Sequence, residues 1–218
     1  MIEDVSLAAN AQVSREVREQ AFGRLVQNGG SEISYLLEVG ADTTADTRLR
    51  WVAIRALGQI KGVQAERVLL QLLSDPQPAI RSATLGALGD FASTEHVAKI
   101  TKGLEDEAVI VRASAAEALG KLKDPTAIVA LDKAINSKDN YYRGTSLWVR
   151  VNYVQALSNI GSTKAYPTLQ KTLYDTDDKV SVATVAALET ISGVSFAEGR
   201  TVEQEKEAWA RWLAARSR

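Results

Sequence analysis

The stretch DEAVIVRASAAEALGKLKDPTAIVALDKAI (residues 106–135) decides the fold, because it reads as two short amphipathic helices joined by a polar turn. In its first half Ala118 and Leu119 follow an arginine by six and seven residues, a spacing that places side chains on one face of a helix with about 3.6 residues per turn. In its second half Leu131 and Ile135 are four residues apart, which is again a helical spacing. The stretch therefore predicts a helical hairpin.

The same pattern recurs along the chain at a fixed interval. Four arginines mark it; the first two intervals are 31 residues, and the third is 38, one period plus a seven-residue insertion. Each arginine is followed by alanine after six residues and by leucine after seven. A fifth copy has Ser181 in the arginine position, and a degraded first copy lies around Arg18. The marking arginines are Arg50, Arg81, Arg112 and Arg150.

Short helical hairpins cannot bury their apolar faces alone, so neighbouring copies must stack into a continuous core. We expect an all-α fold, a right-handed α-solenoid of about six hairpins with a C-terminal capping helix. The chain is expected to be a single domain, residues 1–218. Its expected repeats are residues 12–45, 46–76, 77–107, 108–145 with an insertion at 136–147, 146–176 and 177–192, followed by a cap at 193–218.

The two ends depart from the period. Val13, Val17 and Leu25 predict a first amphipathic helix, and the glycines of QNGGSE (residues 27–32) are expected to break it. At the other end, Thr201 followed by Gln204 fits a capping box at the start of a last helix. The apolar stripe of this helix is interpreted as a lid over the last repeat; it comprises Trp209, Trp212 and Leu213.

The repeat pattern, seen in AIRSATLGALGDF (residues 79–91) and in residues 106–135, resembles short HEAT repeats of the phycobilisome-lyase type over residues 15–192. The resemblance implies a ladder in which aspartates cap helices and accept hydrogen bonds from arginines of the same or the next unit. We interpret these charges as structural, because charges at repeated positions usually serve the repeat. The expected ladder residues are Arg50, Asp75, Arg81, Asp106, Arg112, Arg150 and Asp175.

Composition limits the possible functions. The chain has 26 basic and 27 acidic residues, one histidine and no cysteine. Without a basic excess it has no general attraction for nucleic acid, so a nucleic-acid partner is not expected. Without cysteine it cannot form thiolate metal sites or disulfides or use a cysteine nucleophile. The single histidine, His96, is interpreted as solvated or partly packed. We expect no catalytic residue, cofactor or metal, no membrane insertion, and by default a cytoplasmic protein.

The largest break in the repeat is NSKDNYYRGTSL (residues 136–147), and tyrosines gather in and after it. Tyr, Trp and Arg dominate binding hot spots, since each offers a large rigid surface with a polar group. The alternative is that these aromatic residues fill a gap between spread repeats. The candidate partner-binding residues are Tyr141, Tyr142, Arg143, Trp148, Tyr166, Lys171 and Tyr174.

The sequence offers no nucleophile, acid–base pair or phosphate loop, so we predict a non-catalytic scaffold that binds a protein or peptide in a groove. The second helices should line that groove, with Arg67, Lys99, Lys102 and Lys133. Two alternatives stay open. Phycobilin lyases share this repeat type and attach chromophores to cysteines of a partner protein, which requires no cysteine of their own. HEAT-like DNA glycosylases use a basic concave face, which this chain lacks.

Overall fold

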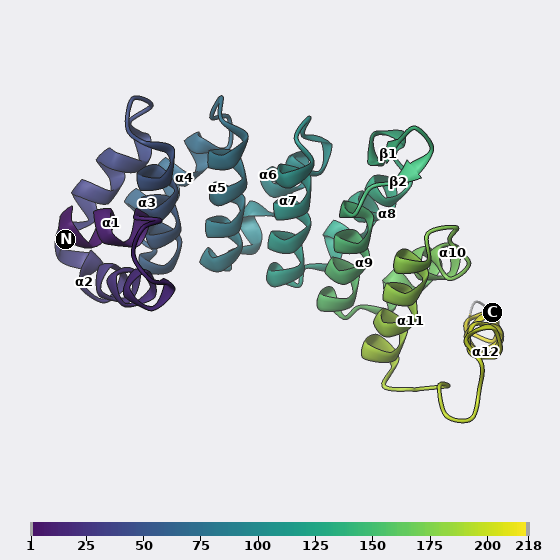
Figure 1. Ribbon diagram of the computed structural model, residues 1–218. Coiled ribbons are helices and arrows are strands. Elements are labelled where there is room, and N and C mark those ends of the chain that lie inside the picture. Colours follow the sequence, from purple (N-terminus) through teal and green to yellow (C-terminus); the bar gives the residue numbers. More distant parts are fainter. Residues whose placement is uncertain (1, 217–218) are drawn as a thin grey trace.

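The fold of the chain is an all-α solenoid (Figure 1). The computed structural model describes residues 2–216, apart from the side chains of residues 31 and 32. None of the helices described is both long enough and apolar enough to cross a membrane. The α-helices are α1 (Ile2–Ala9), α2 (Arg15–Ala41), α3 (Thr47–Ile60), α4 (Val63–Leu72), α5 (Pro78–Phe91), α6 (Val97–Lys102), α7 (Val109–Leu122), α8 (Ile128–Ile135), α9 (Val149–Ile160), α10 (Tyr166–Thr172), α11 (Asp178–Ser192) and α12 (Val202–Ala214).

The second helices of the hairpins are short because several open with a single 3₁₀ turn. These turns are η1 (Thr94–His96), η3 (Pro125–Ala127) and η5 (Thr163–Ala165), whereas η2 (Gly103–Glu105) follows α6 and η4 (Lys138–Asn140) lies in the insertion.

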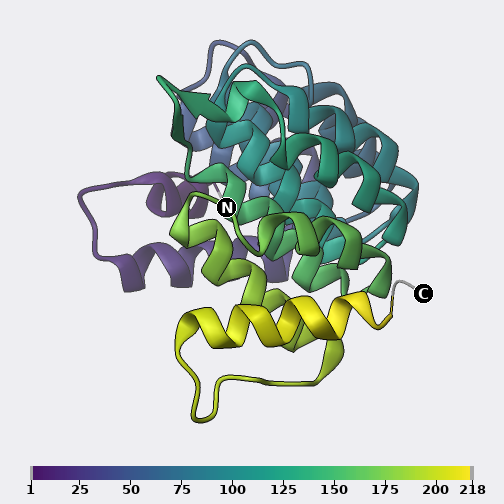
Figure 2. The same cartoon turned by 90° about the vertical axis from the view of Figure 1, so that its right-hand side faces the viewer.

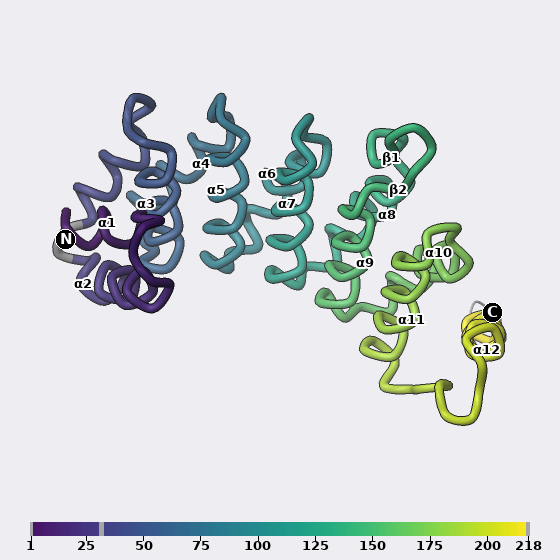
Figure 3. Tube along the Cα trace, viewed as in Figure 1, coloured from purple at the N-terminus to yellow at the C-terminus, as the bar shows by residue number. Residues whose placement is uncertain are grey.

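The first helices of successive hairpins stand side by side in chain order, from α3 to α11 (Figures 1 and 3). They approach closely because a glycine near the end of one helix meets the backbone of an alanine on the next. A Cβ added at Gly58 would lie 2.6 Å from the Cα of Ala87. The same contact recurs one unit later, where a Cβ at Gly89 would lie 2.9 Å from the Cα of Ala118. The repeated glycine therefore sets the spacing of the stack.

Ion pairs tie three of the first helices, α3, α5 and α9, to the loop that precedes the next first helix. In each pair an arginine donates to an aspartate 25 residues further along the chain. Each aspartate also accepts the N–H group two residues after it, at the start of the next helix. The three pairs are Arg50–Asp75 (2.5 Å), Arg81–Asp106 (2.8 Å) and Arg150–Asp175 (2.5 Å).

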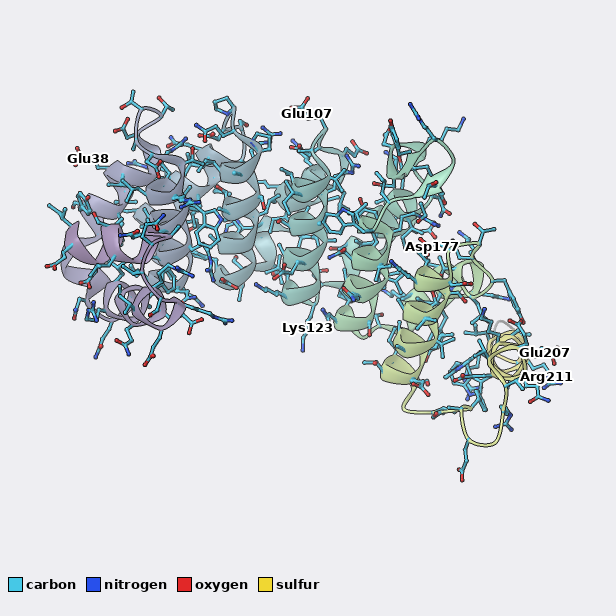
Figure 4. All side chains as sticks on the ribbon, in the orientation of Figure 1. Glu38, Glu107, Lys123, Asp177, Glu207 and Arg211 are labelled. Carbon is cyan, nitrogen blue, oxygen red and sulfur yellow. The ribbon has the colours of Figure 1, made fainter. Side chains whose placement is uncertain are left out.

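Charges at the helix ends follow the helix dipole. Figure 4 places Glu107 and Asp177 beside the N-terminal ends of α7 and α11, and Lys123 at the opposite edge, beyond the C-terminal end of α7. Acidic groups at N-terminal ends and basic groups at C-terminal ends are both favourable. The edge that carries the arginine–aspartate pairs is thus also the edge where the first helices begin.

The N-terminal end differs from the sequence expectation. The predicted break at residues 27–32 is wrong, because α2 continues from Arg15 to Ala41. Gly29 is buried there, and a Cβ at this position would overlap with Cδ1 of Ile60. Because Gly29 has no side chain, the end of α3 packs directly against α2, and the glycine does not end the helix. The short helix α1 packs on both α2 and α3.

At the C-terminal end, α12 crosses the last hairpin (Figure 2). It begins at the capping box of Thr201 and Gln204. Its Trp209 is fully buried and meets the ring of Phe196 edge-to-face, with ring centroids 4.8 Å apart.

The insertion contains a small β-hairpin that the helical pattern did not predict. Strand β1 (Tyr141–Tyr142) pairs antiparallel with β2 (Thr145–Ser146). The turn between them is Arg143 and Gly144, both with positive φ, as the tightest hairpin turns require. Gly144 adopts this backbone without steric cost, whereas Arg143 is one of the few non-glycine residues of the described chain with positive φ, and together they form a projecting tip.

Candidate functional site

A cleft of about 770 Å³ opens where the insertion meets the third and fourth hairpins. We call it the insertion cleft. Its walls include Tyr141 and Tyr142 of β1, Lys133 of α8, Glu105 of η2 and Arg112 of α7. Ligand sites in proteins commonly have volumes of about 300–1,000 Å³, so the cleft can take a small molecule or an extended segment of a partner.

The buried Arg112 beneath this cleft lacks the aspartate that its counterparts have. Position 137, which lies 25 residues after Arg112, is serine. The insertion supplies neutral acceptors in its place: Nε donates to Asn140 Oδ1 at 3.0 Å and Nη2 to the carbonyl of Asp139 at 3.0 Å. Asn140 is held by its own bond to the carbonyl of Ala134. The root of the insertion is therefore part of the core.

The tip of the hairpin projects from this root. Tyr142 is 63% exposed, and the Arg143 guanidinium lies 5.3 Å from its ring centroid. Tyr141 packs against the body of the protein, because its ring centroid lies 4.7 Å from the guanidinium of buried Arg150. An aromatic ring and a cation are thus presented together at the mouth of the cleft.

The charges around the cleft are mixed. Lys133 Nζ lies 2.5 Å from Glu105 Oε1, and this pair is exposed. Burial alone would raise the pKa of Asp106, but hydrogen bonds from Arg81 and from the Ala108 N–H hold it below its ordinary value. Asp106 is therefore an ionised partner of Arg81 at neutral pH, and not a proton donor.

The candidate partner-binding residues do not form one patch. Only Tyr141 and Tyr142 among them line the insertion cleft. Tyr166 lines a different cleft, beneath the C-terminal helix, where its ring meets that of Trp212 edge-to-face at 5.4 Å. Arg143 lies in the turn of the β-hairpin, and Trp148 directly precedes α9 and is 53% exposed. Lys171 lies on α10 and pairs with Asp132 at 3.2 Å, and Tyr174 follows α10 and is 54% exposed.

The candidate groove residues lie on the second helices, as their spacing predicts, and their side chains are exposed. Lys133 is engaged by Glu105. The other members of this set are Arg67 on α4 and Lys99 and Lys102 on α6.

His96 is more buried than the sequence suggests, with 2% of its surface exposed. Its ring meets Phe91 edge-to-face at 5.9 Å, and Nε2 lies 3.2 Å from Glu66 Oε1 without the alignment of a hydrogen bond. No group of three or more potential metal ligands is present within residues 2–216.

Sequence reasoning missed a second recess, where α1, α2 and α3 meet. Trp51 is 40% exposed and lines two hollows of about 430 and 590 Å³, which share several residues. A signal existed in the sequence: Trp51 follows the marking arginine directly, where the next two copies have Ser82 and Ala113. A large aromatic residue at an outward position of one repeat indicates a local contact that the repeat itself does not need.

Comparison with known proteins agrees with the repeat. Residues 66–148 match the family described as HEAT repeats, and residues 49–75 match the PBS lyase HEAT-like repeat. No protein with a curated description matches the sequence.

Several solved structures are similar to this chain, and two of them are described here. The first is a chain from the complex of CpcE and CpcF of phycocyanin lyase from Nostoc sp. PCC7120, 25% identical, with a TM-score of 0.62 over 74% of this chain. The match covers 65% of that chain, so the present chain spans somewhat less than two thirds of its length. The second is an engineered protein, 22% identical, with a TM-score of 0.51 over 88% of this chain and 96% of that chain. At that identity the second match shows the fold alone.

These findings correct one prediction and support another. The prediction that the chain is not an enzyme is contradicted, because the chain is similar to a chain of the phycocyanin lyase complex and residues 49–75 match the PBS lyase HEAT-like repeat. The resemblance inferred from the repeat is confirmed. The chain is a HEAT-repeat protein whose repeats are of the phycobilisome-lyase-like type.

Proposed function

We propose that this chain is a lyase subunit that takes part in joining a bilin to a cysteine of a partner protein. The observation that carries the proposal is the structural likeness to a chain of the phycocyanin lyase complex, together with the PBS lyase repeat at residues 49–75. The absence of cysteine from this chain is compatible with the reaction, because the thiol belongs to the partner.

The proposed reaction is the addition of a thiol across a carbon–carbon double bond of the bilin. One S–C bond forms, the thiol proton is transferred to the neighbouring carbon, and no oxidant or reductant is required. The protein must therefore hold a flat conjugated molecule near a partner's loop and provide groups that relay a proton.

The insertion cleft suits the partner side of this task. Its projecting Tyr142 and Arg143 can contact a protein loop, and the exposed carboxylate of Glu105 also lines the cleft. A tyrosine and an arginine at the tip of a short hairpin are the residue types that anchor protein interfaces.

The direct test is co-expression with a bilin and an apo-phycocyanin subunit as acceptor. A covalent adduct would keep its visible absorption and its zinc-enhanced fluorescence after denaturing electrophoresis. The control is the acceptor with its target cysteine changed to serine, which should remain colourless. If neither an adduct nor any change in the bilin spectrum depends on this chain, the proposed function is wrong.

A further inference from the structure

The recess around Trp51 joins two hollows that share residues of α1, α2 and α3, the three helices at the N-terminal end of the stack (Figure 3). We call it the Trp51 site. Small apolar side chains make up most of the lining of the smaller hollow, and the indole of Trp51 lines both hollows. The residues shared by the two hollows are Ala8, Arg18, Trp51 and Val52.

The rim of the Trp51 site is strongly basic. Four arginines and one glutamate line it, and the glutamate is taken by Arg15, which donates to Glu19 at 2.6 Å. Among the residues that the structure describes, no carboxylate pairs with the other three, Arg18, Arg48 and Arg55. Arg18 makes one hydrogen bond, to the carbonyl of Val13.

This local excess runs against the charge of its surroundings. Residues 1–109 carry 11 basic and 15 acidic side chains, so the half of the chain that holds the site is acidic on balance. Unpaired cations repel one another, and their concentration around an apolar hollow is most readily explained by an anionic ligand.

The aromatic contacts orient one of these cations. The guanidinium of Arg55 lies 4.8 Å from the ring centroid of Trp51 and 5.2 Å from that of Phe22. These two contacts hold the guanidinium beside the rings, and its N–H groups have no hydrogen-bond partner among the described residues. A planar donor beside a planar aromatic wall is suited to a flat ligand with a carboxylate at its edge.

We propose that the Trp51 site binds a flat, conjugated organic carboxylate, with the indole of Trp51 stacked on the ligand and Arg18, Arg48 and Arg55 paired with its carboxylates. The proposal rests on the proposed function in one respect, that the natural ligand is then the bilin, which carries propionate groups. The volumes of the two hollows, about 430 and 590 Å³, lie in the range of small-molecule sites.

The test measures binding of biliverdin by its absorption and of 8-anilinonaphthalene-1-sulfonate, an unrelated aromatic anion, by its fluorescence. We expect Trp51→Ala and the double change Arg48→Gln, Arg55→Gln each to weaken both ligands by at least tenfold. Biliverdin dimethyl ester, whose carboxylates are neutral, should bind at least tenfold more weakly than biliverdin to the unaltered protein.

Matched controls use residues of the same kind outside the site. The double change Arg200→Gln, Arg211→Gln removes two exposed arginines at the other end of the stack, just before α12 and within it. It should leave the affinities unchanged. Circular dichroism of every variant checks that the fold is kept.

The outcomes separate the two proposals. If the unaltered chain binds biliverdin but the Trp51 and arginine variants bind it equally well, the site proposal is wrong and the proposed function stands. If biliverdin does not bind while the naphthalene sulfonate binds and responds to the same variants, the site proposal stands and its assignment to bilin is wrong. If neither ligand binds, or if only an acidic peptide such as hexaglutamate competes at this site, the small-ligand proposal is overturned.

Discussion

Replacing Gly58 by alanine should force apart the hairpin of α3 and α4 and the hairpin of α5 and α6. The added Cβ would lie 2.6 Å from the Cα, 2.7 Å from the Cβ and 2.8 Å from the carbonyl oxygen of Ala87. Such distances are well inside van der Waals contact, and the obstacle is backbone, which cannot rotate away. The only relief is a shift of α5 relative to α3, which would disturb every contact between these helices.

The expected magnitude combines two opposing effects. Overpacking of a tight interior typically costs about 1–3 kcal/mol. Alanine within a helix is favoured over glycine by about 0.5–1 kcal/mol. The net loss for Gly58→Ala is therefore about 0.5–2 kcal/mol.

Gly86 provides the matched control, because it lies within α5 and a Cβ there would meet nothing within 4 Å. Gly86→Ala should gain the helical preference alone, about 0.5–1 kcal/mol. The two variants carry the same chemical change and differ only in what the new methyl group meets.

Urea unfolding followed by circular dichroism measures the difference. With a urea dependence of about 2 kcal/mol per M, a gap of about 2 kcal/mol between the variants separates their midpoints by about 1 M. The cost should also fall along the chain, because the corresponding distances are 2.6 Å at Gly58, 2.9 Å at Gly89 and 3.2 Å at Gly120. If Gly58→Ala is as stable as Gly86→Ala, the close helix approach does not determine the spacing of the repeats.

Three further predictions concern charges and the hairpin. Asp75→Ala leaves buried Arg50 without its carboxylate and should lower the free energy of unfolding by about 3–5 kcal/mol, as urea midpoints would show, whereas Glu19→Ala at an exposed pair should change little. The pKa of Asp106 is lowered in the folded chain, so the ionised carboxylate stabilises the fold above the unfolded carboxyl pKa of about 3.9, and this stabilisation is lost as the pH falls further. Asp106→Asn should therefore reduce the loss of stability at acid pH in a curve of unfolding free energy against pH. An unchanged acid limb of that curve would contradict this. Tyr142→Ala should leave thermal melting unchanged and weaken acceptor binding, whereas Tyr141→Ala should cost about 0.5–2 kcal/mol through its lost contact with Arg150, and equal melting losses for both would refute the distinction.

Periodic features of this fold could be predicted from the sequence because each is repeated with the same neighbours. The arginine at the position of Arg50 and the aspartate at the position of Asp75 both recur in later units. One interpretation of the pair therefore applies to several copies. Gly29 could not be interpreted in this way. Its neighbour Ile60 lies on another helix, and an isolated glycine pair in a sequence is more often a break than a close helix contact.

Of the two candidate sites, only the insertion cleft could be predicted from the sequence, again because of the repeat. The insertion could be found because it interrupts the period. The Trp51 site is assembled from α1, which has no counterpart in the repeat, and from outward positions of α2 and α3 whose proximity depends on how the end of the stack folds. Only the spatial arrangement shows that Arg18 and Arg48 lie beside the same hollow.

The insertion also shows that packing and binding need not be alternatives. Because Ser137 stands where a ladder aspartate is expected, buried Arg112 would keep only the carbonyls of Asp106 and Glu107 as acceptors for Nη1 if residues 136–147 were absent, and its Nε and Nη2 would be left without partners. Asn140 supplies the missing acceptor, and this requires the chain to continue outward and return before α9 begins. That detour is the hairpin whose tip exposes Tyr142. A contact needed by the core thus places an aromatic side chain at the mouth of a cleft, where it can meet a partner without affecting the stability of the stack.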